Sequence, residues 1–166
     1  MTPERAGLFA ELLTEMVEQD NYWIPDQAYY PVHRAFALPV VEVVVVRRTG
    51  AEWEFFLSWR KDDEWDCWHI PGGHWRANQT LEEACNEVSL RELSVSVRVI
   101  EEVKSHKWLD HPKYPLFNAI SHVVVCETDQ TIEETPDAHF FSEIPDGIMI
   151  NHGDFLRKVL MVLATR

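Results

Sequence analysis

The sequence predicts an α/β protein, an α/β/α sandwich with a mixed β-sheet. Three observations predict it: runs of β-branched and aromatic residues are typical of strands, one internal segment carries the start signals of a helix, and apolar residues near both ends of the chain repeat with helical spacing. Of the 166 residues, 46% are hydrophobic, enough for a sizeable core. The chain has no repeat or low-complexity tract, so residues 1–166 are expected to form one domain.

The first 30 residues (1–30) are expected to precede the core as a helix and an aromatic connection. Residues 2–19 have the pattern of a helix, because Thr2 can cap it, Pro3 suits its first turn, and its apolar residues share one face. These apolar residues are Leu8, Leu12, Leu13, Met16 and Val17. The next segment, NYWIPDQAYYP, is rich in rings and interrupted by proline, so we expect an irregular connection that packs over the core. The alternative is that it lies near a ligand or a dimer partner.

The core itself is expected over residues 35–160. The predicted strands cover residues 38–48, 53–60, 66–73, 95–108 and 117–128, followed by a short edge segment at 139–144. A TGAE turn joins the first two strands as a hairpin. A helix is expected at 80–93, where Thr80 and Glu83 have the spacing of a capping box. The segment NHGDFLRKVLMVLATR closes the chain as an apolar helix.

Composition limits what the protein can bind. The net charge of −13 at pH 7 disfavours a nucleic acid or an anionic membrane as partner. A small anionic ligand is still compatible, provided that a divalent metal or a few arginines and lysines neutralise it. Three widely spaced cysteines and eight dispersed histidines predict neither a disulfide framework nor a zinc site. With no signal peptide and no long apolar run, a reduced, cytoplasmic protein is the default expectation.

A Gly-Gly turn followed by a helix is the candidate functional segment. Gly72 and Gly73 allow the backbone to approach a ligand or adopt a positive φ, and the start of the next helix offers free amide groups that favour anions. His74, directly after the turn, is the histidine most expected to touch a ligand. Trp68 and Trp75 flank the turn and could stack on a base or sugar, although core packing explains them equally well.

The stretch from Gly73 to Val95 resembles the Nudix box. That family pattern is a glycine, five residues, Glu, seven residues, Arg-Glu, an apolar residue, any residue, Glu-Glu, any residue, Gly and an apolar residue, and it spans 23 positions, as does this stretch. In this register Gln79 stands at the first Glu, Glu87 and Val88 at Arg-Glu, Arg91 and Glu92 at Glu-Glu, and Ser94 at the closing Gly. The resemblance implies the Nudix fold and a nucleoside diphosphate derivative as ligand.

The metal positions of the box depart from the family pattern. The family places three carboxylates at i, i+3 and i+4 of the helix, on one face, where they gather Mg²⁺. Here those positions are Val88, Arg91 and Glu92, so a cluster of two or three ions is not expected. Glu87 and Arg91 are four residues apart and opposite in sign, which favours an ion pair or two solvated charges.

One branch of the family, the GDP-mannose mannosyl hydrolases, is similar in having a reduced box. The resemblance covers roughly residues 35–160 and includes the downstream segments PDAHFFSEI and IMINHGDFL. It implies a single Mg²⁺, with Mn²⁺ as the other candidate, held by one helix Glu, a loop glycine carbonyl and a later-loop side chain. On this sequence those metal ligands are Glu92, Gly73 and Glu134.

Further roles are implied by the same resemblance. Arg60, at the end of the second strand, falls where an arginine faces the leaving diphosphate, and Glu42 falls near an acidic strand position. The general base of that branch maps near Thr135, which cannot act as a base, so Glu134 and His139 are the catalytic candidates of this loop. Each charged residue also has an ordinary explanation, as an exposed acid, a loop cation or a half-buried strand carboxyl.

Two functions of a ligand pocket remain open on the sequence alone, beside the possibility of a purely structural oligomer partner. The first is a hydrolase of a nucleoside diphosphate sugar or a related derivative, with one Mg²⁺ and low activity because the general base is missing. The second is a ligand-binding or regulatory module that has kept the pocket and lost the chemistry. Both have a small molecule as partner and neither needs nucleic acid or a membrane. Since Nudix proteins often dimerise, a homodimer is left open.

Overall fold

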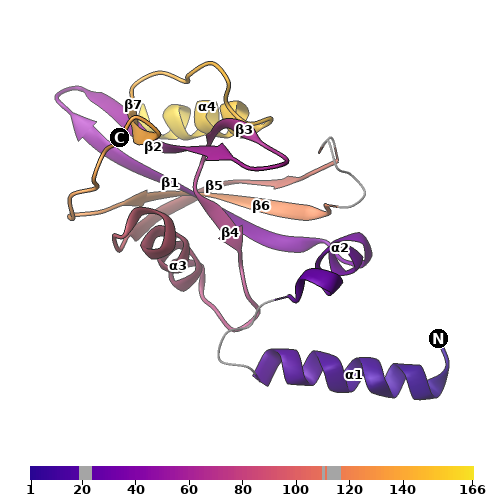
Figure 1. The fold of residues 1–166 in the computed structure, drawn as a ribbon. Helices are drawn as coiled ribbons and strands as arrows, with labels where there is room; N and C mark the ends of the chain where they lie inside the picture. The colour runs from indigo at the N-terminus through magenta and orange to yellow at the C-terminus, as the bar shows by residue number, and fades with distance from the viewer. Residues whose placement is uncertain (19–23, 110, 112–116) are drawn as a thin grey trace.

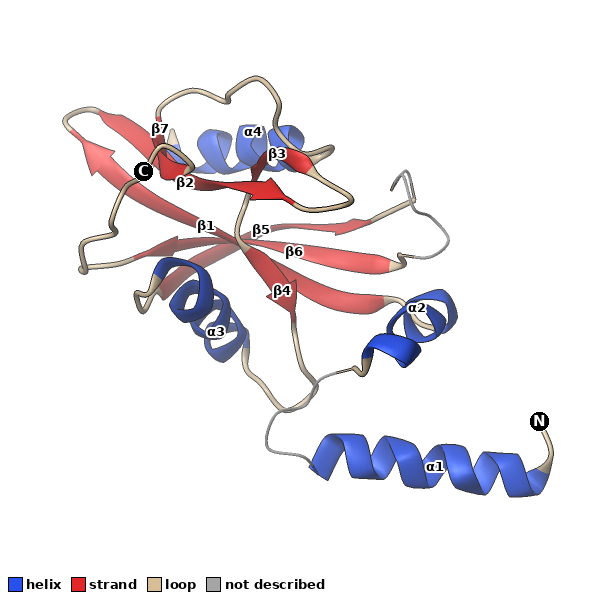
Figure 2. Ribbon diagram, in the orientation of Figure 1, coloured by secondary structure: helices blue, strands red, loops and turns tan. Residues whose placement is uncertain are grey.

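The structure, a computed structural model, describes residues 1–18, 24–109, 111 and 117–166. Figure 1 shows a twisted sheet with α3 and α4 on opposite sides of it, and α1 extending away from this body. The helices are α1 Pro3–Glu18, α2 Asp26–Ala35, α3 Leu81–Leu93 and α4 His152–Leu163. The strands are β1 Leu38–Thr49, β2 Glu52–Lys61, β3 Asp66–His69, β4 Gly72–His74, β5 Arg98–Lys107, β6 Ala119–Glu127 and β7 Ala138–Phe141. The predicted α/β class with a mixed sheet is confirmed (Figure 2).

Strand β1 is the centre of the seven-stranded sheet, whose order is β3-β2-β1-β6-β5 with β7 added to β2. On one edge β1 pairs in parallel with β6. On the other edge it pairs antiparallel with β4 over Val40–Glu42 and with β2 from Val46 onward. Between them the amide of Val43 donates to the carbonyl of Pro71. The strand expected over 66–73 is therefore two strands, and the Gly-Gly turn lies against Glu42.

Alternate residues of β1 supply both cores, because successive side chains of a strand point to opposite faces. Val41, Val43 and Val45 pack in the cluster that contains the buried face of α3. Val44 and Val46 pack in the cluster that contains the buried face of α4. Each fully buried valine stabilises the fold by roughly 1.5–3 kcal/mol. This double burial explains why the strand is apolar almost throughout.

Helix α3 begins with the predicted capping box. The Glu83 amide donates to the Thr80 hydroxyl over 3.2 Å, and the Thr80 amide donates to the Glu83 carboxylate over 2.7 Å. The helix ends at Ser94, whose φ of 58° is left-handed. Both ends match the helix limits predicted from the sequence. The direction in which the last turn of α3 projects its side chains therefore follows from local signals.

Helix α2 replaces the irregular connection expected after α1. Of the segment NYWIPDQAYYP, residues 21–23 lie outside the described residues, and the remainder enters a helix. Pro25 precedes the first turn, where a missing N–H costs nothing, and Pro31 does not end the helix. Tyr29 and His33 lie one turn apart and face the body of the protein, so packing of this face offsets the poor helix propensity.

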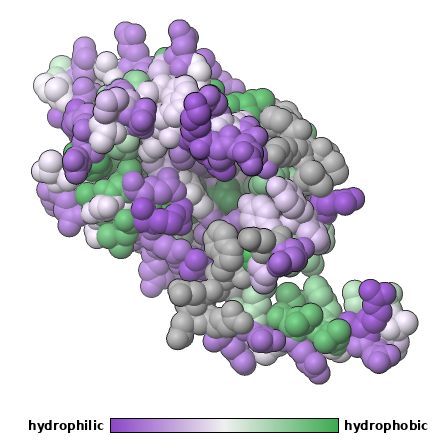
Figure 3. Space-filling view, in the orientation of Figure 1, coloured by the Kyte–Doolittle hydropathy of each residue, from purple (hydrophilic) through white to green (hydrophobic). Residues whose placement is uncertain are grey.

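Helix α1 forms within one residue of the predicted range, but its apolar face is uncovered. Leu8 is 57% exposed and Leu12 is 53% exposed, and Figure 3 shows apolar side chains on the visible side of this helix. The stripe thus makes no core contact of the kind seen for α3 and α4. Among the described residues, no helix combines the length and apolarity required to traverse a bilayer.

Candidate active site

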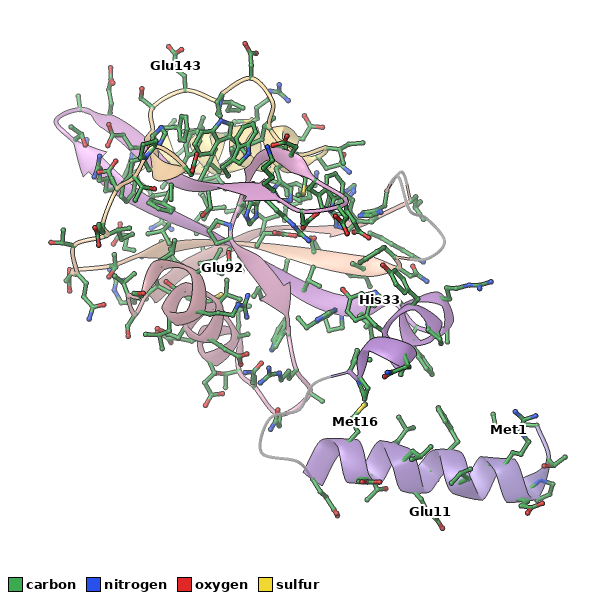
Figure 4. The ribbon with its side chains drawn as sticks, viewed as in Figure 1. Met1, Glu11, Met16, His33, Glu92 and Glu143 are labelled. Atoms are coloured by element: carbon green, nitrogen blue, oxygen red, sulfur yellow. The ribbon has the colours of Figure 1, made fainter. Side chains whose placement is uncertain are left out.

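A pocket of about 730 Å³ opens beside the Gly-Gly turn, between α2, the start of β1 and the end of α3. Its charged wall consists of Glu42, Arg60, Glu64, Arg91 and Glu92. Rings complete the wall, among them Tyr29 and His33 from α2, Trp65, Trp108 and His152. Figure 4 labels two residues of this wall, Glu92 from the end of α3 and His33 from α2. The pocket combines cations, carboxylates and apolar rings.

Gly72 and Gly73, expected as a turn, are instead the first residues of strand β4, and neither has a positive φ, so what they provide is room for close packing. A Cβ on Gly72 would stand 2.6 Å from the carboxyl Oε2 of Glu42 and 3.0 Å from the carbonyl of Val41. A Cβ on Gly73 would stand 3.0 Å from Nη2 of Arg91. Their absence of side chains therefore lets Glu42 and Arg91 lie directly against the turn.

Arg91 links the end of α3 to this turn. Its Nη2 donates to the carbonyl of Gly72 over 2.9 Å and to Oε1 of Glu92 over 2.7 Å. Although Glu92 is an exposed residue overall, its side chain is only 23% exposed and lines the pocket. Desolvation raises the pKa of the Glu92 carboxyl, and the hydrogen bond from Arg91 acts against that rise. Glu92 thus faces the pocket as the predicted register requires.

Glu42 forms the floor of the pocket and is 7% exposed. Its Oε1 accepts a hydrogen bond of 2.7 Å from Ser121, whose hydroxyl accepts one of 2.7 Å from the indole of Trp108. Burial raises the pKa of Glu42 to about 8, a rise that the Ser121 hydrogen bond opposes. At neutral pH this carboxyl therefore carries a proton. Glu42 is thus a proton donor within the same pocket as Glu92.

His152 keeps a neutral imidazole beside Glu42. Burial lowers its pKa to about 3, and its Nδ1 accepts a hydrogen bond of 3.0 Å from the amide of Ile70. Its Nε2 lies 3.8 Å from Glu42 Oε2, but with the acid protonated and the imidazole neutral the contact is not an ion pair. Burial likewise lowers the pKa of His69 to about 4. The floor of the pocket is therefore nearly uncharged at neutral pH.

Of the expected substrate contacts, Arg60 and His74 both line the pocket together with Glu42. Arg60, on β2, is 44% exposed and its Nε donates to Asp62 over 2.6 Å. Nε2 of His74 lies 3.1 Å from Nε2 of His33 on α2. Burial lowers the pKa of both imidazoles, that of His33 to about 4. One of the two rings therefore donates to the other without carrying a charge.

Glu134 and His139, expected as metal ligand and catalytic residues, are engaged elsewhere. Glu134 forms an ion pair of 2.7 Å with Arg47 and accepts from the amide of Phe140 over 3.1 Å. His139 stacks on Phe141 with ring centroids 4.2 Å apart. Neither residue lines the pocket that holds Glu92. The reason is geometric: Arg47 stands five residues beyond Glu42 along the extended strand, which separates the two by roughly 16 Å.

The ion pair expected between Glu87 and Arg91 is not the one formed. Oε1 of Glu87 pairs with Nη2 of Arg76 over 2.9 Å, and its Oε2 accepts from Gln79 over 2.5 Å. Gln79 also accepts from the Arg76 amide over 3.1 Å. Gln79 therefore links the loop to α3 and stabilises the conformation of the loop. Arg91 is thereby free to turn toward Gly72.

The residues present do not fit the metal cluster of a full Nudix box. Of the three helix positions, Val88 is 1% exposed inside the core and Arg91 is a cation. The remaining carboxylate, Glu92, and the carbonyl of Gly72 both accept from Arg91. Within residues 1–18, 24–109, 111 and 117–166, no three His, Cys, Asp or Glu side chains gather as a metal site.

Several pocket residues were not anticipated from the sequence. They are His33 on α2 and Trp108 and His152 around Glu42, with Ser121 behind Glu42 as its hydrogen-bond donor. The four-residue spacing of Tyr29 and His33 was the available signal for a helix face. No comparable local signal connects Ser121 to Glu42, because these residues meet only through the parallel pairing of β6 with β1.

Comparison with known proteins supports the fold. No family model matches the chain, and no curated protein matches it. A C. elegans Ap4A hydrolase matches at a TM-score of 0.60 and 14% identity, covering 77% of this chain and 99% of that one. The NUDIX domain of Shewanella oneidensis NrtR, solved with ADP ribose, matches at 0.59 and 14%, covering 83% and 98%. A MutT/nudix family protein of Enterococcus faecalis matches at 0.64 and 16%, covering 95% and 70%. The chain therefore has the Nudix hydrolase fold.

Proposed function

We propose that this protein is a Nudix-type hydrolase of a nucleoside diphosphate derivative, with a nucleoside diphosphate sugar such as GDP-mannose as the first candidate and low activity. The observation that carries the proposal is that one pocket contains two arginines, the half-buried carboxyl of Glu92, the buried carboxyl of Glu42 and several rings. Its volume of about 730 Å³ lies within the range of small-molecule sites.

The two arginines suit a diphosphate. Arg60 reaches the pocket from β2 and Arg91 reaches it from α3, and a guanidinium binds phosphate oxygens through two parallel N–H donors. Tyr29 and Trp65 offer rings on which a base can stack. These are the parts of a nucleoside diphosphate: an anionic group that needs cations and a flat group that needs rings. The ADP ribose bound by the NrtR domain and the Ap4A of the worm hydrolase belong to the same chemical class.

The two carboxyl groups suit acid–base chemistry. Glu92 accepts a hydrogen bond from Arg91, which opposes the rise in its pKa that desolvation causes, and in its ionised form it can accept the proton of an attacking water. Glu42, with a pKa raised to about 8 by burial, can return a proton to the leaving oxygen. Two carboxyl groups in different environments can provide one site with both an acid and a base. No step of this scheme passes through a metal ion.

A second candidate is ligand binding without turnover, as in a regulatory module. The observation that favours it is again the Arg91 contact: a carboxylate paired with a guanidinium is a weaker base than a free one. The sequence-based prediction of one Mg²⁺ on Glu92, Gly73 and Glu134 receives less support, since Glu134 pairs with Arg47.

A substrate panel tests both candidates. Purified protein is incubated with nucleoside diphosphate sugars, ADP-ribose and dinucleoside polyphosphates, and products are separated by chromatography while binding is measured by calorimetry. Turnover that falls about 10²-fold or more in Glu92→Gln supports the hydrolase. The matched control is Glu82→Gln, an exposed acid on the same helix. Binding without turnover supports the second candidate, and absence of binding contradicts both.

A further inference from the structure

We propose that Arg91 is the resident cation of this pocket: its guanidinium stands where a Nudix box holds a divalent metal ion, so diphosphate binding needs no metal. The claim about diphosphate binding rests on the proposed function. The claim that this site does not bind a divalent metal ion can be tested with a metal ion alone.

The contacts of Nη2 carry the inference. This nitrogen lies 2.9 Å from the carbonyl of Gly72 and 2.7 Å from a carboxylate oxygen of Glu92. A backbone carbonyl and a carboxylate are the oxygen ligands that Mg²⁺ prefers. They converge here on an N–H group of a side chain that cannot lose its proton. A permanent cation therefore satisfies Glu92, the predicted helix ligand, and the carbonyl of Gly72, the neighbour of the predicted ligand Gly73.

The neighbouring helix positions provide no further carboxylate ligands for a metal ion. Val88, one turn before Glu92, is 1% exposed and packs in the core cluster of α3. Arg91 adds a positive charge where the box pattern has a negative one, so these three helix positions carry no net charge. A divalent ion approaching Glu92 meets repulsion from Arg91 and lacks a second helix carboxylate. Both effects weaken metal binding in the same direction.

The same guanidinium remains accessible to a ligand. Arg91 is 49% exposed and lines the pocket, although its Nη2 makes two hydrogen bonds. A guanidinium has five N–H donors, so the contacts to Gly72 and Glu92 fix its position while other donors can reach a diphosphate. Held in this way, Arg91 acts as a preorganised cation. Its placement also explains why Gly73 must lack a Cβ, which would stand 3.0 Å from Nη2.

Mn²⁺ binding to the intact protein, measured from the loss of the free-ion paramagnetic resonance signal, tests the first half. Wild type is expected to bind no Mn²⁺ at this site. Arg91→Glu is expected to gain a site, because it adds a carboxylate beside Glu92 and releases the Gly72 carbonyl, and its affinity should exceed wild type at least about tenfold. Arg48→Glu, the same charge change on an exposed residue of β1 that lies over Trp53, is the matched control and should gain none.

Binding of ADP-ribose, measured by calorimetry with chelator and then with Mg²⁺, tests the second half. Wild-type affinity should agree within about twofold in the two buffers, and Arg91→Gln, which keeps N–H donors without the charge, should weaken it about tenfold or more. Arg91→Gln also serves if Arg91→Glu unfolds, because it should lose ligand affinity without gaining Mn²⁺. Circular dichroism checks the fold of each variant.

Two results would overturn the inference. One is Mn²⁺ binding by wild type that disappears in Glu92→Gln, which would make Glu92 a working metal ligand. The other is ADP-ribose binding that requires Mg²⁺. If no nucleotide binds in any buffer, the proposed function fails, whereas the Mn²⁺ comparison between wild type and Arg91→Glu still decides the role of Arg91.

Discussion

The hydroxyl of Ser121 donates a hydrogen bond of 2.7 Å to Glu42, joining the parallel strands β6 and β1 beneath the pocket. Trp108 donates in turn to this hydroxyl, so Glu42, Ser121 and Trp108 form a buried chain of hydrogen bonds. A carboxyl in this position is neutral when protonated and costly to ionise, because little solvent reaches it. The stability of the protein is therefore coupled to the protonation of Glu42.

This coupling predicts a loss of stability as pH rises. Burial raises the folded-state pKa of Glu42 from 4.5 to about 8, so between these values the folded state binds a proton that the unfolded state lacks. The stabilisation is complete below the unfolded pKa and is lost as pH rises through the folded one. Between about pH 7 and about pH 8 the contribution of Glu42 to the free energy of unfolding should fall by about 1 kcal/mol, measured with urea as the difference between wild type and Glu42→Gln.

Glu42→Gln is the control for this pH dependence. Glutamine can accept the Ser121 hydrogen bond and does not ionise, so this part of the decline should be absent from the variant. The buried imidazoles of His33, His69 and His152 are neutral in the folded state over this range, and their partial protonation in the unfolded state near pH 7 adds a small rise in stability that wild type and variant share. Equal slopes in wild type and variant would show that Glu42 is ionised at neutral pH.

Gly72→Ala is expected to destabilise the fold by roughly 1–3 kcal/mol. The new Cβ would stand 2.6 Å from the Glu42 carboxyl, which can move, and 3.0 Å from the Val41 carbonyl, which is fixed in the sheet. The measurement is urea unfolding at one pH. Gly153→Ala in α4 is the matched control, because its Cβ would meet only ordinary contacts of 3.5 Å or more. An unchanged midpoint for Gly72→Ala would contradict the close approach.

Much of the fold was predictable because its signals are local. The valine run of β1, the capping box of Thr80 and Glu83, and the length of the loop after Gly73 each depend on neighbouring residues. Helix α2 was missed because the prolines at 25 and 31 argue for a break, whereas the ring contacts of Tyr29 and His33 that favour the helix are tertiary. The spacing of apolar residues likewise shows which side chains of α1 share a face, but it does not show whether another element covers that face.

The candidate site was predictable in part for the same reason. The direction of Glu92 follows from the register of α3, and Arg60 follows from the end of a hairpin strand. The location of Glu134 depends on where β7 pairs with β2 and on the nearby Arg47. The hydrogen bond of Arg91 to Gly72 depends on the fold of the turn, so sequence spacing alone pointed to Glu87 as the partner of Arg91.

Ser94→Gly should stabilise the protein by roughly 0.5–1 kcal/mol. Ser94 caps α3 with a φ of 58°, a conformation that glycine adopts without the clash of a Cβ. Thermal unfolding should show a higher midpoint for the variant. Ser142→Gly, at an exposed serine outside the left-handed region, is the matched control and should lower the midpoint slightly. A lower midpoint in Ser94→Gly would mean that the serine side chain stabilises this helix end.

Glu134→Gln should leave nucleotide affinity within about twofold of wild type, whereas Arg60→Gln should weaken it about tenfold or more. The reason is position: Arg60 lines the pocket, and Glu134 instead joins Arg47 to the amide of Phe140. Loss of this pair should cost no more than about 1 kcal/mol, because both side chains are more than a third exposed. Calorimetric titration with ADP-ribose and urea unfolding measure the two quantities on the same samples. A large loss of affinity in Glu134→Gln would return this carboxylate to the site, through a closure of the loop before β7 onto the bound ligand.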